Sequence, residues 1–464
     1  MNRYRNIVNR VPLFRENLSP YPEGPDQSLD VAGADIAVFG HVFAPVIFSY
    51  VLYVLNDAHE RGIGKLVFLA RDGYLFYKAA LLLAPVIAPD IKLTYMSVSR
   101  FSLRSAEYFI SGEKCMDTIC TGGLGMTFRK MMKRASLEDE ETDYIASKTE
   151  MSGRIDDVLD YRKICDLKER LRNVPEFFEI VKKHASGKWQ ILQDYLAQEG
   201  MKEGFGRGIA IVDSGWIGTV QKSLDRLITW PKDTGSELEG YYFGLYSLPA
   251  GTDSSRYHSY YISPDLSIKN IRRRSRFSIC LFEAVCSAPE GLTTGYIHDG
   301  SGKIIPVTSE EGNPNKDAIV RYEEILLKDA GRLAEGTSLT ESSACLSKLE
   351  RMCEDLLSLC MSEPSCEEAS CFGKMKFCDD VLENDMKDLA EKWDESDLSA
   401  NRLMNKLRIK CGMKNGSLPE SGWPEGSIVN ACKGEASKAG RYLRSERRSK
   451  ILTEVRKSGV KRGR

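Results

Sequence analysis

The sequence predicts an α/β protein whose mainly parallel, Rossmann-like sheet is interrupted by a helical insertion and followed by a helical C-terminal region. Two short apolar runs, Lys65–Ala70 and Ile209–Val212, have the composition of strands buried on both faces of a parallel sheet. A glycine-containing turn and a helical pattern follow each run, which is the alternation of a βα unit. Between these units, residues 105–203 are polar and helical in pattern, which indicates an insertion.

The elements can be justified in chain order from apolar spacing and from turn residues. The Asp213 carboxylate and the glycines after it are expected to end the third strand at Val212. The expected elements are a buried helix over Val46–Leu55, a strand over Lys65–Ala70, a helix over Tyr74–Leu83, a strand over Ile91–Val98, a helix starting at Pro175, a strand over Ile209–Val212, a helix with Val220, Leu224 and Ile228 on one face, and a strand over Glu239–Tyr246.

The length of 464 residues allows two or three domains. The predicted division is an N-terminal arm (1–34), the first part of the α/β core (35–104), a helical insertion that caps the sheet edge (105–203), the second part of the core (204–310) and a helical C-terminal region with a basic tail (311–464). The arm is expected to act as a linker, because it has little apolar content and contains Pro12, Pro20, Pro22 and Pro25.

Composition limits the class of protein. An apolar fraction of 42% and a charged fraction of 28% are ordinary for a soluble globular chain, and the net charge of −1 gives no reason to expect a specific nucleic-acid partner. The thirteen cysteines form no CxxC pair, so we expect thiols in a reducing cytoplasm rather than a zinc site or a disulfide framework.

One segment, Ile36–Leu55, is free of charge and just long enough to span a bilayer. Gly40 and Pro45 interrupt it, and its first part (Asp35–Gly40) reads equally as a separate turn or strand. A buried core helix is therefore favoured over a membrane span. No secretory signal is visible in Met1–Asp30, so we expect a cytoplasmic protein without a transmembrane segment.

The candidate site lies where the two strands end. Asp72 and Asp213 follow the strands directly, and parallel strands bring their carboxyl ends to one sheet edge, where ligands of open α/β sheets bind. Carboxylates bind Mg²⁺ or act as bases, whereas arginine forks hold phosphate. We assign Asp72 and Asp213 as catalytic and Mg²⁺-binding residues. The expected phosphate- or substrate-binding residues are Arg71, Gly73, Ser99, Arg100, Ser214, Gly215, Trp216, Gly218, Thr219 and Glu283.

Each of these assignments has a structural alternative. Asp72 and Asp213 could be helix N-caps, although two such loops in one chain favour a site. Trp216 could stack on a sugar or base, or close the core as a buried aromatic lid. Glu283 could be catalytic or could pair with Arg272–Arg276, a group that could also supply a cation to the pocket. The basic tail over Arg441–Arg464 reads better as a solvated end than as a contact for anionic lipid or nucleic acid.

The same residues carry a family resemblance. Over roughly residues 35–300 the chain resembles, in matching order, bacterial haloacid-dehalogenase-like hydrolases of surface-polysaccharide biosynthesis, in the region downstream of their usual hydrolase domain. The matching blocks are Phe68–Tyr74, Ser99–Arg100, Val212–Thr219 with Gln221, Gly240–Gly244 and Ala288–Gly291. The resemblance implies a phosphate-ester hydrolase and a glycosyltransferase as a partner.

The chain departs from that family's catalytic pattern. Haloacid-dehalogenase-like phosphatases use a nucleophilic aspartate and a second aspartate two residues later. Here Ala70 stands two residues before Asp72, and Gly215 stands two residues after Asp213. Neither aspartate has the required companion, which weakens the phosphatase assignment.

A more distant resemblance is to type I phosphoribosyltransferase-like proteins. Arg71–Gly73 is similar to their pyrophosphate loop, and Asp213–Thr219 is similar to their phosphoribosyl-pyrophosphate loop, with Ser214 in place of the usual second acid. We therefore expect a cytoplasmic hydrolase or transferase acting on a phosphorylated sugar or nucleotide with Mg²⁺. The alternative is a phosphoribosyltransferase-like protein or a catalytically inactive module that binds a ligand or partner.

Overall fold

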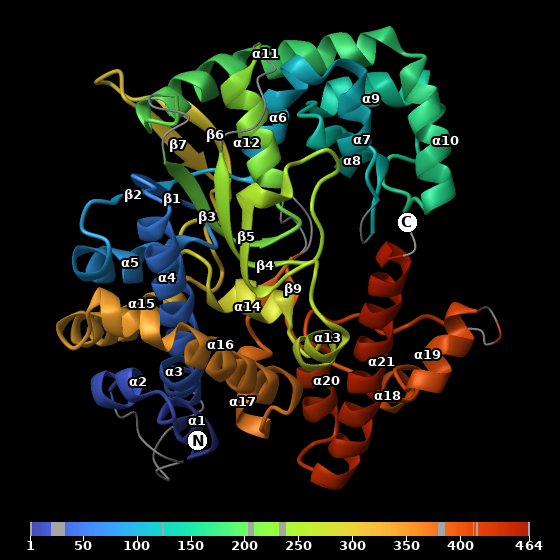
Figure 1. Ribbon diagram of the computed structural model, residues 1–464. Coiled ribbons are helices and arrows are strands. Elements are labelled where there is room, and N and C mark those ends of the chain that lie inside the picture. Colours follow the sequence, from blue (N-terminus) through green and yellow to red (C-terminus); the bar gives the residue numbers. More distant parts are fainter. Residues whose placement is uncertain are drawn as a thin grey trace.

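A five-stranded parallel sheet forms the centre of the molecule (Figure 1). The computed structural model describes residues 2–19, 33–122, 125–202, 208–231, 238–378, 386–411, 413 and 416–462. The strands are β1 (Lys65–Leu69), β2 (Lys92–Met96), β3 (Ile209–Trp216), β4 (Glu239–Leu245) and β5 (Tyr257–Ile262), in the order β2-β1-β3-β4-β5. The predicted α/β class with a parallel sheet is confirmed.

The strand order puts the topological switch point between β1 and β3. Lys65 of β1 pairs with Lys92 of β2 on one side and with Ile209 of β3 on the other. The chain leaves these two neighbouring strands in opposite directions across the sheet, which opens a crevice at their carboxyl ends. The first loop singled out by sequence follows β1, and the second begins within the last residues of β3.

Helices cover both faces of the sheet, as the uninterrupted apolar strands require. Leu66 and Phe68 point into one core and Val67 and Leu69 into the other, as alternate residues of a strand do. The first core is built with α4 (Ala44–Glu60), α5 (Tyr74–Ile87), α15 (Lys316–Glu335) and α16 (Leu339–Ser362); the second is built with α6 (Arg100–Ser111), α11 (Pro175–Gln198) and α12 (Thr219–Thr229).

The charge-free segment is one long helical run over Ala34–Glu60, made of α3 (Ala34–Val38), a π-helical turn (Phe39–Phe43) and α4. The expectation of a separate turn or strand over Asp35–Gly40 is therefore wrong. By length and composition this run could cross a membrane, but 94% of its most apolar window is buried inside the protein. It packs against α5 and α16 as a central core helix.

The N-terminal arm is not a linker where it is described. It forms α1 (Asn2–Val8) and α2 (Pro12–Asn17), and Tyr4 and Phe14 are fully buried in the main core. Pro12 begins α2 because its fixed φ and missing N–H suit a first helical turn. Pro20, Pro22 and Pro25 lie outside the described residues.

The insertion is helical, as expected, and has an apolar core of its own. It contains α7 (Met116–Ile119), α8 (Phe128–Arg134), α9 (Asp139–Lys148), α10 (Tyr161–Arg172) and the first half of α11, which starts at Pro175 as predicted. In Figure 1 it stands on the same side of the sheet as the red C-terminal helix α21 (Ala436–Arg462).

Two elements of the sheet differ from the sequence-based expectation. Strand β3 does not stop at Asp213 but continues to Trp216, because Gly215 and Trp216 pair with Gly244 and Leu245 of β4. Strand β5 was not expected, since its mixture of tyrosine, serine and histidine has no clear apolar alternation. It forms the edge of the sheet beside β4.

The remaining elements follow the sheet. They are α13 (Ile268–Arg274), α14 (Ile279–Val285), the antiparallel pair β6 (Thr293–His298) and β7 (Ile304–Thr308), α17 (Cys366–Phe372), the pair β8 (Lys376–Phe377) and β9 (Lys387–Asp388), α18 (Glu395–Ala400), α19 (Leu403–Lys410), α20 (Pro424–Ala431) and α21. All thirteen cysteines lie in the described residues and none forms a disulfide, as expected.

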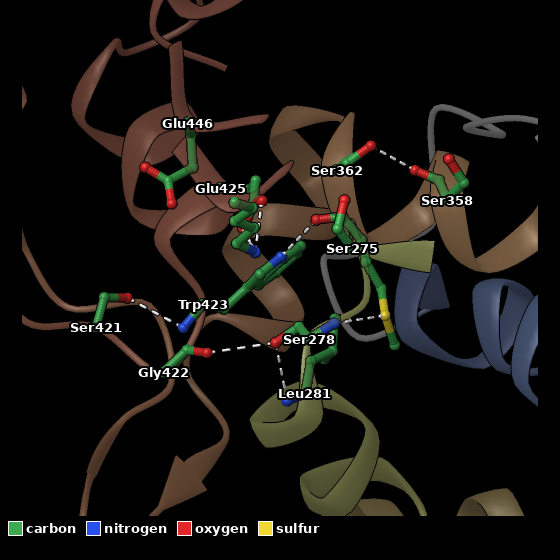
Figure 2. A network of polar contacts seen from close by, with 12 residues as sticks. Ser275, Ser278, Leu281, Ser358, Ser362, Ser421, Gly422, Trp423, Glu425 and Glu446 are labelled. Atoms are coloured by element: carbon green, nitrogen blue, oxygen red, sulfur yellow. Dashed lines mark hydrogen bonds and ion pairs between the residues drawn. The ribbon is translucent and has the colours of Figure 1, made fainter. Parts of the chain in front are cut away.

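The C-terminal region is fixed to the core by a polar network around Trp423 (Figure 2). The buried Trp423 indole donates to the Met361 carbonyl at 2.8 Å, and the Ser278 hydroxyl donates to the Gly422 carbonyl at 3.3 Å. Lys450 of α21 pairs with Glu425 of α20 at 2.7 Å. These contacts hold α20 and α21 against α14, next to the carboxyl edge of the sheet.

Candidate functional site

A cleft of about 1230 Å³ opens at the carboxyl ends of β1 and β3. Its floor contains Arg71, Asp72 and Asp213. One wall comes from α8 of the insertion, and another from α21. The cleft therefore lies at the switch point, where the predicted site residues converge.

Asp72 lies in the turn after β1 and receives a hydrogen bond from the Ser214 hydroxyl on β3. This contact joins the two predicted loops directly. Burial raises the pKa of Asp72, while the Ser214 hydrogen bond and the charges of Arg71 and Arg100 oppose the rise. Asp72 thus sits in a place that disfavours its charge unless a cation is nearby.

Asp213 is the second carboxyl group of the floor. Burial, followed by the negative charge of Asp72, raises the pKa of Asp213 to about 8. Backbone N–H groups of Ser214 and Gly215 oppose this rise, and the Tyr50 hydroxyl donates to the Asp213 backbone carbonyl at 3.1 Å. Two carboxyl groups that interact strongly at a cleft floor are typical of functional sites.

Neither aspartate is a helix N-cap. The cap of α5 is Gly73 and the cap of α12 is Gly218, and neither helix start has a capping hydrogen bond from a side chain. The structural alternative for Asp72 and Asp213 is therefore wrong. A carboxylate that caps a helix is favoured in its charged form, whereas the raised pKa values of Asp72 and Asp213 show that their charged forms are disfavoured.

Glu283, on α14, completes a group of three carboxyl side chains. Burial and then the charge of Asp72 raise the pKa of Glu283 to about 8. The Trp216 indole N–H donates to its Oε1 at 2.7 Å. The Trp216 ring is only 9% exposed and packs against Phe277 and Phe282, so it closes the core beneath the cleft, which is the geometry of a lid rather than of an open stacking surface.

The arginines near residue 274 do not enter the cleft. Arg274 pairs with Glu350 at 2.6 Å, and Arg273 pairs with Glu354 at 2.8 Å, both on α16. Arg276 donates to the Ser358 hydroxyl of the same helix at 2.7 Å. The expectation that this group supplies a cation to the pocket, or pairs with Glu283, is wrong, because α16 provides closer carboxylates.

Arg100 is the first residue of α6 and lines the cleft. Its charge opposes the raised pKa values of Asp72, Asp213 and Glu283. The preceding Ser99 caps α6: its hydroxyl accepts from the Ser102 N–H at 2.9 Å and donates to the Thr293 carbonyl at 2.6 Å. Ser99 lines the cleft, but these two contacts give its hydroxyl the task of holding Arg100 in place.

The glycines let backbone segments approach closely. A Cβ on Gly73 would lie 2.5 Å from the Leu69 carbonyl, and one on Gly215 would lie 2.0 Å from the Gly244 carbonyl. Gly218 adopts a left-handed conformation with φ +73° and starts α12 at Thr219. The N–H groups at the start of that helix therefore face the cleft that Gly218 and Thr219 line.

Several cleft residues were not singled out from the sequence. Lys130 and Arg134 of α8 enter from the insertion, and Lys450 and Thr453 enter from α21. Their sequence context is that of ordinary solvated helices, and only the tertiary arrangement brings them to the sheet edge. The predicted capping insertion indicated in general that residues 105–203 would approach the site. No sequence feature indicated that the C-terminal region would do so.

Comparisons leave the function to be argued from this geometry. No protein-family model matches the chain, and no curated protein matches it. Within the described residues there is no group of three or more His, Cys, Asp or Glu arranged to hold a metal ion. The carboxyl oxygens of Asp72 and Asp213 still fit a hard cation such as Mg²⁺, which uses one or two carboxylates and keeps several waters.

Proposed function

We propose that the protein is an enzyme that binds a phosphorylated sugar or nucleotide in this cleft and transfers a group from it. The observation that carries the proposal is the gathering of Asp72, Asp213 and Glu283 with Arg100 at the switch point of the sheet. Such an arrangement binds an anionic ligand beside groups that exchange protons near neutral pH.

The phosphate end of the ligand is assigned to Arg71, Arg100 and the start of α12. Guanidinium groups match phosphate oxygens in a bidentate manner, and free N–H groups at a helix start attract an anion. All three features line the same cleft. Its volume of about 1230 Å³ exceeds that of an ordinary drug-sized pocket, so it has room for a sugar nucleotide and an acceptor.

Asp213 and Glu283 are assigned to proton transfer. Because burial and Asp72 raise both of their pKa values to about 8, each carboxyl group holds its proton at neutral pH and can donate it to a leaving group. A Mg²⁺ ion held by Asp72 and Asp213 would neutralise ligand phosphate and carboxylate charge together. Because Asp213 must lose its proton to hold the ion, Glu283 would be the proton donor in the Mg²⁺-loaded site. Arg100 then orients the phosphate beside these carboxyl groups.

Group transfer is favoured over phosphate-ester hydrolysis by the aspartate nucleophile mechanism. Ala70 stands where a haloacid-dehalogenase-like pair with Asp72 would need its nucleophilic aspartate, and Gly215 stands where a pair with Asp213 would need its second aspartate. The parallel sheet with loops after β1 and β3, and with an insertion between β2 and β3, is compatible with the phosphoribosyltransferase-like resemblance. A sugar phosphate or phosphoribosyl donor is therefore the first ligand class to examine.

The test uses calorimetric titration and product analysis with Mg²⁺, phosphoribosyl pyrophosphate and a panel of nucleoside diphosphate sugars. Asp72→Asn, Asp213→Asn and Glu283→Gln should each lower turnover by at least about a hundredfold while the fold is kept. Asp160→Asn, which changes a surface cap of α10, is the matched control and should keep full activity. Full turnover in all three cleft variants would refute the proposal.

A second function is a module that binds its ligand, or a glycosyltransferase partner, without catalysis. The observation in its favour is that the Asp72 carboxylate already accepts a hydrogen bond from the Ser214 hydroxyl. On this reading the wild-type protein binds a phosphorylated sugar or nucleotide in the titration but forms no product. The same experiment thus separates the two functions.

A further inference from the structure

We propose that the groove between α19 and α21 is a docking surface for an anionic membrane. The groove has a volume of about 450 Å³ and is separate from the cleft at the sheet edge. It is lined by Arg402, Leu403, Met404, Asn405, Arg441, Arg444, Ser445 and Arg448. Half of these residues are arginines, and none is acidic.

The guanidinium groups of the groove are available to a partner. Arg441, Arg444 and Arg448 are exposed on one face of α21, and they make no ion pair or side-chain hydrogen bond with the described residues. Arg402 lies over the Tyr442 ring at 5.4 Å, which leaves its N–H groups at the edge of the groove.

Nearby acidic side chains do not cancel this charge. Glu446 is buried and is occupied by Lys406 at 2.6 Å and by Asn401 at 2.8 Å. Glu395 of the neighbouring α18 pairs with Lys438.

Exposed apolar side chains near the arginines favour a lipid surface over nucleic acid as the anionic partner. Met404, which lines the groove, exposes 59% of its surface. Leu407, later in α19, and Met413, just after that helix, expose 37% and 71%. Figure 1 shows α18 and α19 at the outer edge of the molecule, beside α21. Basic residues next to protruding apolar ones are typical of surfaces that lie in a lipid interface, whereas phosphate groups of nucleic acid give methionine no partner.

The docking surface and the cleft use different sides of α21. Ser449, Lys450 and Thr453 line the cleft, whereas Arg441 and Arg448 line the groove. At about 100° per residue the two sets point to roughly opposite sides of the helix. A membrane bound at the groove would therefore leave the cleft open, and the inference does not depend on the function proposed for the cleft.

The test is sedimentation of the full-length protein with vesicles of phosphatidylcholine, with or without phosphatidylglycerol. The wild-type protein should bind only the anionic vesicles. Arg441→Gln with Arg444→Gln and Arg448→Gln should lower the partition coefficient about a hundredfold, because each basic residue near an anionic bilayer contributes roughly a fivefold factor. Met404→Ser with Met413→Ser should lower it roughly tenfold.

A matched control removes three other exposed cations, by Arg162→Gln, Lys163→Gln and Lys182→Gln on the insertion. This variant should bind vesicles like the wild type, and circular dichroism checks that all variants are folded. Equal binding by the groove and control variants would overturn the proposal. So would wild-type protein that binds a short single-stranded DNA through the three arginines but leaves both kinds of vesicle in the supernatant.

Discussion

Asp213 is the residue at which a structural and a functional role can be told apart. Its carboxyl group is partly buried at the floor of the cleft and lies near the charge of Asp72, and its pKa is raised to about 8. A residue kept for stability would be charged and paired, because an unfavourable charge weakens the folded state. The folded protein therefore disfavours the charged form of Asp213, and a bound cation would stabilise that form.

The strain gives stability a defined pH dependence. The folded-state pKa of Asp213 is raised from 3.8 to about 8, so the folded protein keeps a proton that the unfolded chain releases between these values. The stability contributed by this group is therefore present at low pH and is lost as pH rises to about 8. Asp213→Asn should remove on the order of a few kcal/mol of this loss.

Urea unfolding at pH 5 and pH 8 measures the effect. The variant should exceed the wild type's free energy of unfolding by a larger margin at pH 8 than at pH 5, because most of the loss between pH 3.8 and about 8 falls between these two pH values. A wild-type stability that stays flat over this range, with the variant less stable at both pH values, would mean that Asp213 is a structural polar group.

Mg²⁺ binding should depend on the protonation state of Asp213. If Asp72 and Asp213 hold the ion, raised pKa values require Asp213 to lose its proton on binding. The affinity for Mg²⁺ should then rise up to about tenfold per pH unit below pH 8. Calorimetry in two buffers of different ionisation enthalpy measures the released proton directly. Binding without proton release, or unchanged in Asp213→Asn, would place the ion elsewhere.

At the level of elements, the close pairing of β3 and β4 depends on Gly215. Its φ of +120° and the Gly244 carbonyl, only 2.0 Å from a Cβ built on it, leave no space for a side chain. Gly215→Ala should destabilise the protein by about 3 kcal/mol or more, because both the backbone conformation and the sheet pairing resist it.

Gly251→Ala is the matched control for that prediction. Gly251 also has a positive φ, +74°, but nothing lies within 4 Å of its built Cβ. This substitution should cost only about 1 kcal/mol, the penalty of the backbone conformation alone. Thermal unfolding compares the two variants, and equal losses would show that the contact with Gly244 is unimportant.

The elements also show how far the sequence can predict this fold. Strands β1 and β2 and the first half of β3 follow from short apolar runs, because both faces of the sheet are covered by helices. The second half of β3 could not be foreseen, since Asp213 and Ser214 break the apolar pattern where β3 still pairs with β4. Strand β5 could not be predicted for the same reason, because its polar and aromatic residues show no clear apolar alternation.

The candidate site divides in the same way. Asp72 and Asp213 were predictable because a strand end fixes where a following side chain goes in a parallel sheet. The hydrogen bond from Trp216 to Glu283 and the approach of Lys130 depend on how distant segments pack. No local pattern records such packing. Sequence periodicity therefore locates the floor of the site, and tertiary structure supplies its walls.

For the whole molecule, the C-terminal region completes the cleft rather than forming a separate appendage. Lys450 of α21 is partly buried, pairs with the fully buried Glu425 of α20, and lines the cleft. Burial raises the pKa of Glu425 and the Lys450 charge opposes that rise, so the two groups depend on each other. The wall of the cleft is thus held by an ion pair whose carboxylate is buried.

Removal of one partner should be much more harmful than removal of both. Lys450→Met leaves Glu425 buried without its cation and should cost about 3–5 kcal/mol, whereas Lys450→Met with Glu425→Gln should regain most of that loss. Lys438→Met removes a lysine of the same helix that is equally buried but pairs with the exposed carboxylate of Glu395, and it should cost less than about 1 kcal/mol. Urea unfolding of the four proteins measures these differences, and ligand titration shows whether the cleft survives.

If the double variant recovers its stability and still binds the phosphorylated ligand, the ion pair only anchors α21. If stability returns without binding, Lys450 also contacts the ligand, because its charge is then the one feature of the wall that is missing.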